Sequence, residues 1–303
     1  MRPTDILYIK NLHQYYAATG LGKPRHPLIG IYNFGDLPAI SVDAGIRFML
    51  GFYVITIKYK CNCKSVYGQT TYDYDEGVMG FFGPNQVMGI DPEMAFPEDG
   101  WCLVFHPDFL QGYDLSRKIR NYHFFNYSVR EALILSADEE RDMEELFRKI
   151  QKEIGRPIDN FSQDVLVAQL ELLLTFSNRY YNRQFITRKP INNQLLTRFE
   201  ALLDDYFKTD GRNEGLPTVS YFAEKLHLSG KYLSDMLKQL TGLTAQQHIQ
   251  EKIIEIAKQQ LSTTNLTVSE IAYRLGFNYS QSFNKFFKDK TAQTPLAFRT
   301  HFN

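Results

Sequence analysis

The residues of this chain that could do chemistry are the tyrosines, cysteines and histidines of the first half and the lysines, amides and hydroxyls near the C-terminus. Cys61 and Cys63 lie two apart on a predicted strand and point into one apolar face, and no second Cys/His pair completes a tetrahedral metal site. The histidines are scattered without a His-x-His pair, and no Gly-x-Ser-x-Gly, P-loop or Gly-x-Gly-x-x-Gly motif occurs. We therefore predict no catalytic residue, no metal and no cofactor.

Several tyrosines in a short stretch of the first half could line a pocket for a small organic effector. Aromatic walls with a few polar groups are typical of such pockets. The same side chains could instead fill the core of their own domain, and the pattern leaves both alternatives open. The candidates for effector binding are Tyr53, Tyr59, Tyr67, Tyr72 and Tyr74.

The last third of the chain contains an internal repeat. Val219, Ser220, Ala223, Leu226 and Leu228 recur 49 residues later as Val268, Ser269, Ala272, Leu275 and Phe277. After one inserted residue the offset becomes 50, and Leu233, Met236, Leu237, Lys238, Thr241 and Thr244 match Phe283, Phe286, Phe287, Lys288, Thr291 and Thr294. Each unit reads as a short helix, a tight turn and a second helix, which is the outline of a helix-turn-helix over about 219–241 and 268–291.

The residue types within each unit fit that outline. Ala223 and Ala272 are small where two helices must approach closely, and Ser229 and Ser280 are predicted to be the N-caps of the second helices. Helical spacing predicts that Leu233, Met236, Leu237 and Leu240 point inward in the first unit, as do Phe283, Phe286 and Phe287 in the second.

The opposite faces of the two second helices are polar and partly basic. Amides and hydroxyls can read base edges in a major groove, and lysines can neutralise phosphates. Asp235 could accept a hydrogen bond from a cytosine amine or orient Lys231. The predicted DNA-binding residues are Lys231, Ser234, Asp235, Lys238, Ser280, Gln281, Asn284, Lys285 and Lys288.

Length and charge agree with a second, basic module. The chain has 303 residues, enough for two domains, and a net charge of zero. The segment from Thr218 to Asn303 contains ten Lys/Arg and six Asp/Glu, so its net charge is about +4 and that of the rest of the chain is about −4. The longest apolar run is too short for a membrane span, the N-terminus lacks a signal-peptide core, and three cysteines fit a reducing compartment. We expect a cytoplasmic protein without a membrane partner.

The elements before the repeat read first as strands. Ile55, Ile57, Tyr59, Cys61 and Cys63 alternate with Thr56, Lys58, Lys60, Asn62 and Lys64, which predicts a strand over Ile55–Lys64 with the first set inward and the second in water. Ile29–Phe34, Val78–Phe82 and Trp101–Phe105 are further predicted strands. Many short strands with no helix between them favour an antiparallel barrel or sandwich.

Two helices are predicted to follow the strands. Ser136 and Glu139 form a capping box for a helix that runs to about Gly155. The second helix, Ser162–Arg183, has a wide apolar face made by Leu166, Val167, Leu170, Leu172, Leu173, Leu174 and Phe176. This face either packs on its own barrel or forms a dimer contact. The segment 187–193 is predicted to be a linker, because Pro190 disfavours helix at Lys189.

The C-terminal motifs resemble the AraC/XylS family of bacterial transcription regulators. Ser269–Phe277 matches the family's "EIA…LGF" pattern, and Ser282–Lys288 with Thr294–Arg299 matches "SxFxxxFK…TPxxxR". The resemblance implies two helix-turn-helix units joined by a central helix, here about Ala245–Leu261, with both recognition helices in successive major grooves. Ala292 departs from the family's usual glycine, which Gly242 keeps in the first unit, so a weakened helix C-cap is expected.

By architecture alone, the front half resembles the family's cupin-like regulatory domain, which often binds an effector and is often followed by dimerising helices. The resemblance implies an α+β chain with a cupin-like antiparallel β-barrel and two helices in domain 1–190, and an all-α DNA-binding domain in 191–303. The implied partners are a double-stranded DNA operator, a small-molecule effector bound by the barrel, a second copy in a homodimer and, for an activator, RNA polymerase. The alternatives are a cupin-type enzyme with a helical appendage and an adaptor whose repeat binds protein.

Overall fold

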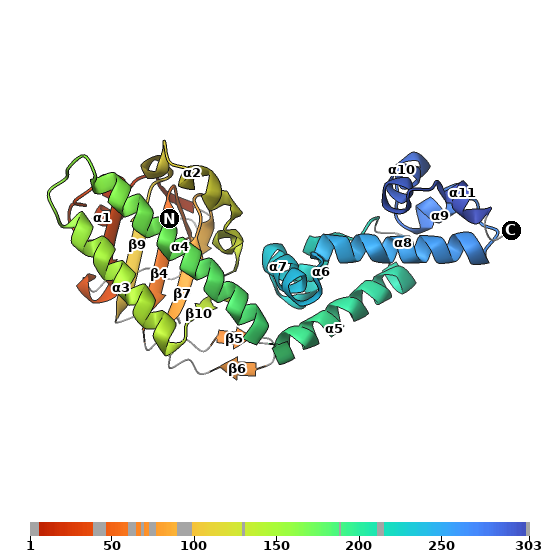
Figure 1. Ribbon diagram of the computed structural model, residues 1–303, viewed down its shortest axis with the longest axis horizontal. Helices are drawn as coiled ribbons and strands as arrows, with labels where there is room; N and C mark the ends of the chain where they lie inside the picture. Colours follow the sequence, from red (N-terminus) through yellow and green to blue (C-terminus); the bar gives the residue numbers. More distant parts are fainter. Residues whose placement is uncertain are drawn as a thin grey trace. The chain divides into compact units, whose positions relative to one another are not determined.

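The computed structural model describes residues 6–38, 47–59, 65–67, 70–72, 77–89, 99–128, 131–187, 189–210 and 215–300. The chain divides into two compact units, Met1–Gln184 and Phe185–Asn303, and each is described by itself (Figure 1). Within its described residues the first unit has ten strands, with α1 (Leu12–Thr19) and α2 (Leu115–Lys118) between them, and two long helices after them, whereas the described elements of the second unit are helices. The architecture is therefore α+β, while the assignment of regulation to 1–190 and of DNA binding to 191–303 stays a prediction.

The largest sheet of the N-terminal unit is antiparallel and has the order β10-β7-β4-β9-β2. Its strands are β2 (Ile29–Asn33), β4 (Tyr53–Lys58), β7 (Val78–Phe82), β9 (Gly100–Phe105) and β10 (Leu133–Ile134). A smaller sheet joins β1 (Ile6–Ile9), β3 (Arg47–Leu50) and β8 (Val87–Gly89), and β5 (Ser65–Tyr67) pairs with β6 (Thr70–Tyr72).

The predicted closed antiparallel barrel is not what the described strands form. They make three separate sheets, and β1 pairs with β3 in parallel through the register Ile6↔Arg47 to Ile9↔Leu50. A parallel neighbour needs a crossover connection, which here includes a helix, α1 (Leu12–Thr19). The predicted strands at Ile29–Phe34, Val78–Phe82 and Trp101–Phe105 are confirmed as β2, β7 and β9.

The central strand β4 is buried on both faces, which corrects its predicted alternation. Ile55 and Ile57 are fully buried as expected, but Thr56 is only 8% exposed. The register places Thr56 opposite Cys102, which in turn pairs with Tyr32, and the Tyr32 ring contacts the tyrosines of α1. A helix therefore covers the face that the sequence predicted to be in water. Lys58 is half-buried, which lowers its pKa, and Lys60–Lys64 lie outside the described residues.

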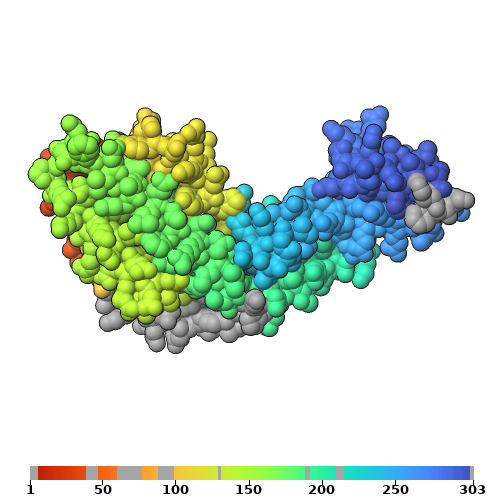
Figure 2. Space-filling view, in the orientation of Figure 1, coloured from red at the N-terminus to blue at the C-terminus, as the bar shows by residue number. Residues whose placement is uncertain are grey.

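The other face of the sheet is covered by α3 (Ala137–Ile154) and α4 (Ser162–Thr187), whose side chains form the near face of the N-terminal unit in Figure 2. The capping box of α3 is confirmed, because Ser136 Oγ accepts from the Glu139 N–H and the Glu139 carboxylate accepts from the Ser136 N–H. Leu166, Val167, Leu170, Leu173 and Leu174 are buried, so these side chains of α4 pack on their own unit. Leu172 is instead 46% exposed on the outer side of the helix.

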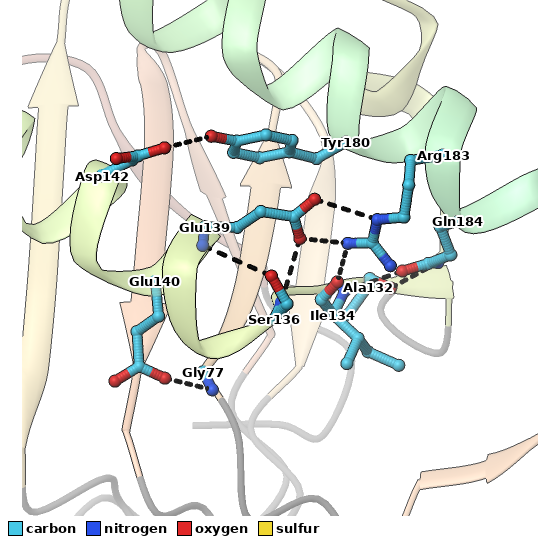
Figure 3. A network of polar contacts seen from close by, with 10 residues as sticks. All are labelled: Gly77, Ala132, Ile134, Ser136, Glu139, Glu140, Asp142, Tyr180, Arg183 and Gln184. Carbon is cyan, nitrogen blue, oxygen red and sulfur yellow. Dashed lines mark hydrogen bonds and ion pairs between the residues drawn. The ribbon is translucent and has the colours of Figure 1, made fainter. Parts of the chain in front are cut away.

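A polar network that the sequence did not predict ties α3, α4 and β10 together (Figure 3). Arg183 pairs with Glu139 and donates through Nη2 to the Ile134 carbonyl over 2.7 Å. Gln184 accepts from the Ile134 N–H over 2.8 Å and donates to the Ala132 carbonyl over 3.2 Å. Because Gln184 is fully buried, these bonds satisfy groups that would otherwise be costly to bury. The network fixes the last turns of α4 on the edge strand β10.

The C-terminal unit consists of helices in the part of the chain that the structure describes. They are α5 (Lys189–Asp205), a π-helical turn (Tyr206–Asp210), α6 (Val219–Leu226), α7 (Gly230–Thr241), α8 (Ala245–Thr263), α9 (Val268–Arg274), α10 (Ser280–Thr291) and α11 (Pro295–Arg299). The central helix expected at Ala245–Leu261 is confirmed as α8, which a capping box of Thr244 and Gln247 begins.

The predicted linker at 187–193 is mostly helical, which corrects the sequence-based interpretation. Helix α4 extends to Thr187 and α5 begins at Lys189. Pro190 falls in the first turn of α5, where a backbone N–H has no helical partner in any case, so the proline is tolerated there. The effect of Pro190 on Lys189 was overestimated, because a proline at a helix start does not break the helix.

Candidate DNA interface

The two repeats form two helix-turn-helix units, α6 with α7 and α9 with α10. Both turns have the same backbone geometry. His227 adopts the left-handed conformation (φ 58°) and the Leu228 N–H donates to the Ala223 carbonyl over 2.8 Å. Gly276 (φ 90°) occupies the same place in the second unit, where the Phe277 N–H donates to the Ala272 carbonyl over 3.0 Å. Ala223 and Ala272 are buried, as predicted for small residues at a close helix contact.

The matched threonines also have equivalent roles. Thr241 Oγ1 donates to the Leu237 carbonyl and Thr291 Oγ1 to the Phe287 carbonyl, each over 2.8 Å. Thr244 and Thr294 cap the helices that follow, α8 and α11. The repeat found in the sequence is therefore a repeat of structure as well as of residue type.

The apolar faces of the second helices are mostly as predicted. Leu233, Met236, Leu237, Phe283 and Phe287 are fully buried. Leu240 and Phe286 are only half-buried, because they lie at the edge of the apolar stripe. Tyr232, which the sequence analysis left out, is fully buried, and its ring lies 5.2 Å from that of Phe185.

The predicted DNA-binding residues lie on the outer faces of α7 and α10. The exposed ones are Lys231, Lys238, Gln281, Asn284, Lys285 and Lys288, and the half-buried ones are Ser234, Asp235 and Ser280. Each helix thus presents cationic and uncharged polar side chains together on one side, which is the chemistry that phosphates and base edges require.

One predicted helix cap is wrong. Ser229 caps α7 as expected, since its side chain accepts from the Tyr232 N–H over 3.2 Å. The N-cap of α10 is Tyr279, and Ser280 is the first residue inside the helix. The second unit has one more residue in its turn than the first, so residues after the turn correspond at an offset of 50. The residue that matches Ser229 is therefore Tyr279 and not Ser280.

The C-caps of the recognition helices differ as the sequence indicated. Gly242 ends α7 with φ 83° and Ala292 ends α10 with φ 60°, and in both cases the cap N–H donates to the carbonyl four residues earlier. The alanine keeps the hydrogen bond, but an L-residue with a Cβ in the left-handed region costs about 1 kcal/mol.

We expect Ala292→Gly to raise the free energy of unfolding of the C-terminal unit by about 1 kcal/mol, because it removes this strain. The reverse change, Gly242→Ala, should lower it by a similar amount, since a Cβ at Gly242 would meet no atom within 4 Å and only the backbone strain would be added. Urea unfolding followed by circular dichroism measures both. Shifts of the same sign in the two variants would contradict the explanation.

The two helix-turn-helix units are joined by α8 and by a close contact between backbone segments. A Cβ built on Gly276 would lie 2.2 Å from the Gly215 carbonyl oxygen and 2.4 Å from its carbon. The turn of the second unit therefore packs directly on the backbone segment that precedes the first unit. This contact, with α8 between α7 and α9, fixes the spacing of the two recognition helices within the unit.

Two of the basic residues counted in the charge excess form ion pairs or hydrogen bonds within the C-terminal unit. Lys252 on α8 pairs with Asp204 over 2.8 Å and with Glu255 over 3.0 Å, and the hydrogen bond with Asp204 raises the lysine pKa. Arg299 donates to the Leu261 carbonyl over 3.2 Å and to the Leu266 carbonyl over 2.6 Å. These two cations therefore stabilise helix connections within the C-terminal unit.

A family model described as a helix-turn-helix domain matches residues 222–301. The chain is 31% identical over 138 residues to the HTH-type transcriptional activator RhaS of Escherichia coli, which covers 46% of this chain and 45% of that protein. It is 36% identical over 109 residues to the ornithine utilization regulator of Pseudomonas aeruginosa, covering 36% of this chain and 30% of that protein. The helix-turn-helix part of this chain belongs to the AraC/XylS family.

The match to AraC/XylS relatives is partial. The chain spans less than half the length of both curated relatives, and the family model covers only the helix-turn-helix part. Among solved structures, the C-terminal domain of the response regulator yesN from Fusobacterium nucleatum is 34% identical, covering 33% of this chain and 96% of that chain with a TM-score of 0.30. AraC/XylS proteins are regulators of transcription rather than enzymes.

The structure shows what several residues of the AraC/XylS pattern do. Gly276 of the "LGF" motif supplies both a left-handed turn and room for the Gly215 carbonyl. Arg299 of the "TPxxxR" motif donates to carbonyls at the end of α8 and before α9. Phe277 and Pro295 are buried in the core of the unit. Much of the family signature therefore serves the fold of the C-terminal unit.

The predicted effector residues are only partly described. Tyr53 is half-buried, with its ring 5.0 Å from Phe105 and 4.9 Å from Phe125, and burial raises its pKa. The Tyr59 hydroxyl is buried and has no hydrogen-bond partner among the described residues, and burial raises its pKa well above the usual range. Tyr67 and Tyr72 belong to the β5–β6 hairpin, and Tyr74 lies outside the described residues. The structure therefore describes the side chains of Tyr53 and Tyr59 alone among these five, and effector binding by the five tyrosines stays a prediction.

Neither metal ligands nor a membrane span stand out in the part of the chain that can be described. Within it, no group of three or more His, Cys, Asp and Glu side chains is placed to hold a metal ion. None of the described helices is long and apolar enough to cross a bilayer.

Proposed function

We propose that this chain is a sequence-specific transcription regulator that binds an operator with α7 and α10. The observation that carries the proposal is the pair of equivalent helix-turn-helix units, each with exposed lysines on a polar face of its second helix, together with the AraC/XylS helix-turn-helix match. In such units the second helix enters the major groove with its N-terminal residues nearest the base edges. Two rigidly joined units then contact two successive grooves on one side of the duplex.

The residue types suggest a division of labour on these faces. Lys231 and Gln281 occupy equivalent positions in the first turns of α7 and α10, at offset 50, and are both exposed, so we assign base contacts to them. Lys238 and Lys288 are also equivalent, lie in the last turns and are exposed, so we assign phosphate contacts to them. Ser234, Asp235, Ser280, Asn284 and Lys285 complete the proposed interface.

Salt dependence of binding tests the proposal. An operator selected from random-sequence DNA should bind the full chain with an affinity that falls steeply with salt, because each neutralised phosphate releases counterions. Lys238→Ala and Lys288→Ala should each weaken binding to all sequences alike and reduce the salt slope by about 1.

Lys252→Ala is the matched control, because this lysine is already paired with Asp204 and Glu255 and should not contact phosphate. Its salt slope should equal that of the wild type. Fluorescence anisotropy at several salt concentrations measures all three variants. Equal slopes for all of them, or the same loss in Lys252→Ala, would contradict the assignment.

We further propose that the N-terminal unit receives a small-molecule input, as the order of strands and two helices shared with the family's cupin-like regulatory domain suggests. The buried Tyr59 hydroxyl, for which the described residues offer no hydrogen-bond partner, supports a polar effector group near this strand. We expect the effector to bind near Tyr53–Tyr74 and to act by moving α3 and α4. A homodimer and a contact with RNA polymerase stay predictions.

Coupling between effector and DNA should be reciprocal. A ligand found by thermal shift in a metabolite panel should change operator affinity by about 1–3 kcal/mol, and operator DNA should change ligand affinity by the same factor. Calorimetric titration with and without DNA measures both. A panel without any thermal shift, together with an experimental structure whose N-terminal unit has no cavity of ligand size, would retire this proposal.

A further inference from the structure

Five helices of the C-terminal unit have the same kind of N-cap, and the recognition helix α10 lacks it. A hydroxyl side chain accepts a backbone N–H three residues on at the start of α6, α7, α8, α9 and α11, from Thr218, Ser229, Thr244, Thr267 and Thr294. Helix α10 begins instead with Tyr279, whose side chain makes no cap hydrogen bond. An N-cap of this kind stabilises a helix by about 1 kcal/mol, so the sequence forgoes stability at this position.

Within the described residues, the side chain of Tyr279 makes no polar or ring contact that compensates for the missing cap. It is 70% exposed, although a tyrosine can normally bury most of its ring. Its backbone is extended (φ −137°, ψ 132°), so no turn geometry requires this residue type. No ring contact, ion pair or side-chain hydrogen bond joins Tyr279 to another residue of the described ranges. Its equivalent in the first unit, Ser229, is a half-buried cap.

A locally unfavourable residue that the fold does not use points to a role in binding. We propose that Tyr279 contacts the operator at the edge of the groove that α10 enters, where its hydroxyl donates a hydrogen bond to a backbone phosphate and its ring covers the adjoining sugar. This inference rests on the proposed function, because it needs α10 to lie in a major groove. It makes Tyr279 a positioning residue for Ser280 and Gln281, the next two residues along the chain.

The chemistry favours a phosphate over a base as the partner of the hydroxyl. The residue before a recognition helix lies beside the backbone of one strand, whereas the first turn of the helix faces the bases. Tyrosine hydroxyls are among the side-chain groups that contact phosphates, and such contacts set register without reading sequence. The first unit has no aromatic residue at this place, so the anchor belongs to the second unit alone.

Two substitutions of Tyr279 distinguish the contribution of its hydroxyl from the contributions of its ring and of the missing N-cap. Tyr279→Phe removes only the hydroxyl and should weaken operator binding about 3–10-fold, equally for variant operators, with an unchanged melting temperature. Tyr279→Ser removes the ring and restores the N-cap. It should weaken binding about 10–100-fold while the C-terminal unit melts about 2–8 °C higher. Ser229→Ala, which removes the equivalent cap of α7, should lower the melting temperature and serves as the stability control.

Operator affinity by anisotropy and melting by circular dichroism, both on the full chain, decide the outcome. A Tyr279→Ser variant that melts higher and binds more weakly supports the proposal. Binding within twofold of the wild type would overturn it, and so would a lower melting temperature, since the tyrosine would then serve the fold. A wild-type chain without salt-dependent DNA binding would instead refute the proposed function itself, so the two failures are distinguishable.

Discussion

Replacing Gly276 by alanine should destabilise the C-terminal unit by about 2–5 kcal/mol and abolish operator binding at 37 °C. The added Cβ would lie 2.2 Å from the Gly215 carbonyl oxygen and 2.8 Å from the Leu216 nitrogen, which are backbone atoms that cannot rotate away. The residue also has a φ of 90°, which adds strain for any residue with a Cβ. A loss of this size is a large fraction of the stability of a typical domain.

Two comparisons isolate the close approach from the backbone strain. Gly242→Ala adds a Cβ in open space at a similar φ and should cost only about 1 kcal/mol. His227, at the turn of the first unit, shows that a left-handed residue other than glycine is tolerated there. Urea unfolding of the full chain, followed at the transition of the C-terminal unit, measures the difference. Equal losses in Gly276→Ala and Gly242→Ala would show that the contact with Gly215 is not tight.

The helix-turn-helix units were predictable because their signals are local. Apolar spacing and small residues at helix contacts act within about 25 residues, and the internal repeat shows the same local pattern twice. The N-cap of α10 was predicted at Ser280 instead of Tyr279, because an inserted residue moves the helix start by one position and alignment of side-chain types alone does not show where the helix begins.

The N-terminal unit was harder to predict because long-range packing decides it. Thr56 is polar yet buried, since α1 covers a face that alternation assigns to water. The parallel pairing of β1 with β3 joins segments about 40 residues apart, and no local pattern reports it. Likewise, Arg299 and Lys252 contributed to the basic excess counted from the sequence. Only the structure shows that Arg299 donates to backbone carbonyls and that Lys252 pairs with carboxylates.

Substitutions in the first turns of the recognition helices should change base preference more than overall affinity. Lys231→Ala and Gln281→Ala should each cost about 1–3 kcal/mol at one or two base pairs and leave non-specific binding almost intact. The two residues are equivalent by the repeat, and both are exposed. Each variant should therefore relax a different half of the operator, because the two helices occupy different grooves.

Substitution of Asp235 distinguishes two possible roles of its carboxylate in the part of the operator that α7 contacts. Asp235 lies four residues after Lys231, one helical turn away, and is half-buried. If its carboxylate accepts from a cytosine amine, Asp235→Asn should change the preferred base at one position of its own. If it orients Lys231, Asp235→Asn and Lys231→Ala should relax the same base pair, and the double variant should lose no more than either single one.

Selection of operators from random DNA with the wild-type chain, Lys231→Ala and Gln281→Ala tests the central claim most directly. The wild type should select two short blocks of preferred bases with centres about 10 base pairs apart, one helical turn of DNA. Lys231→Ala should erase preference in one block only, and Gln281→Ala in the other only. A single block, or wild-type preferences in both variants, would show that α7 and α10 do not read the operator in the way proposed.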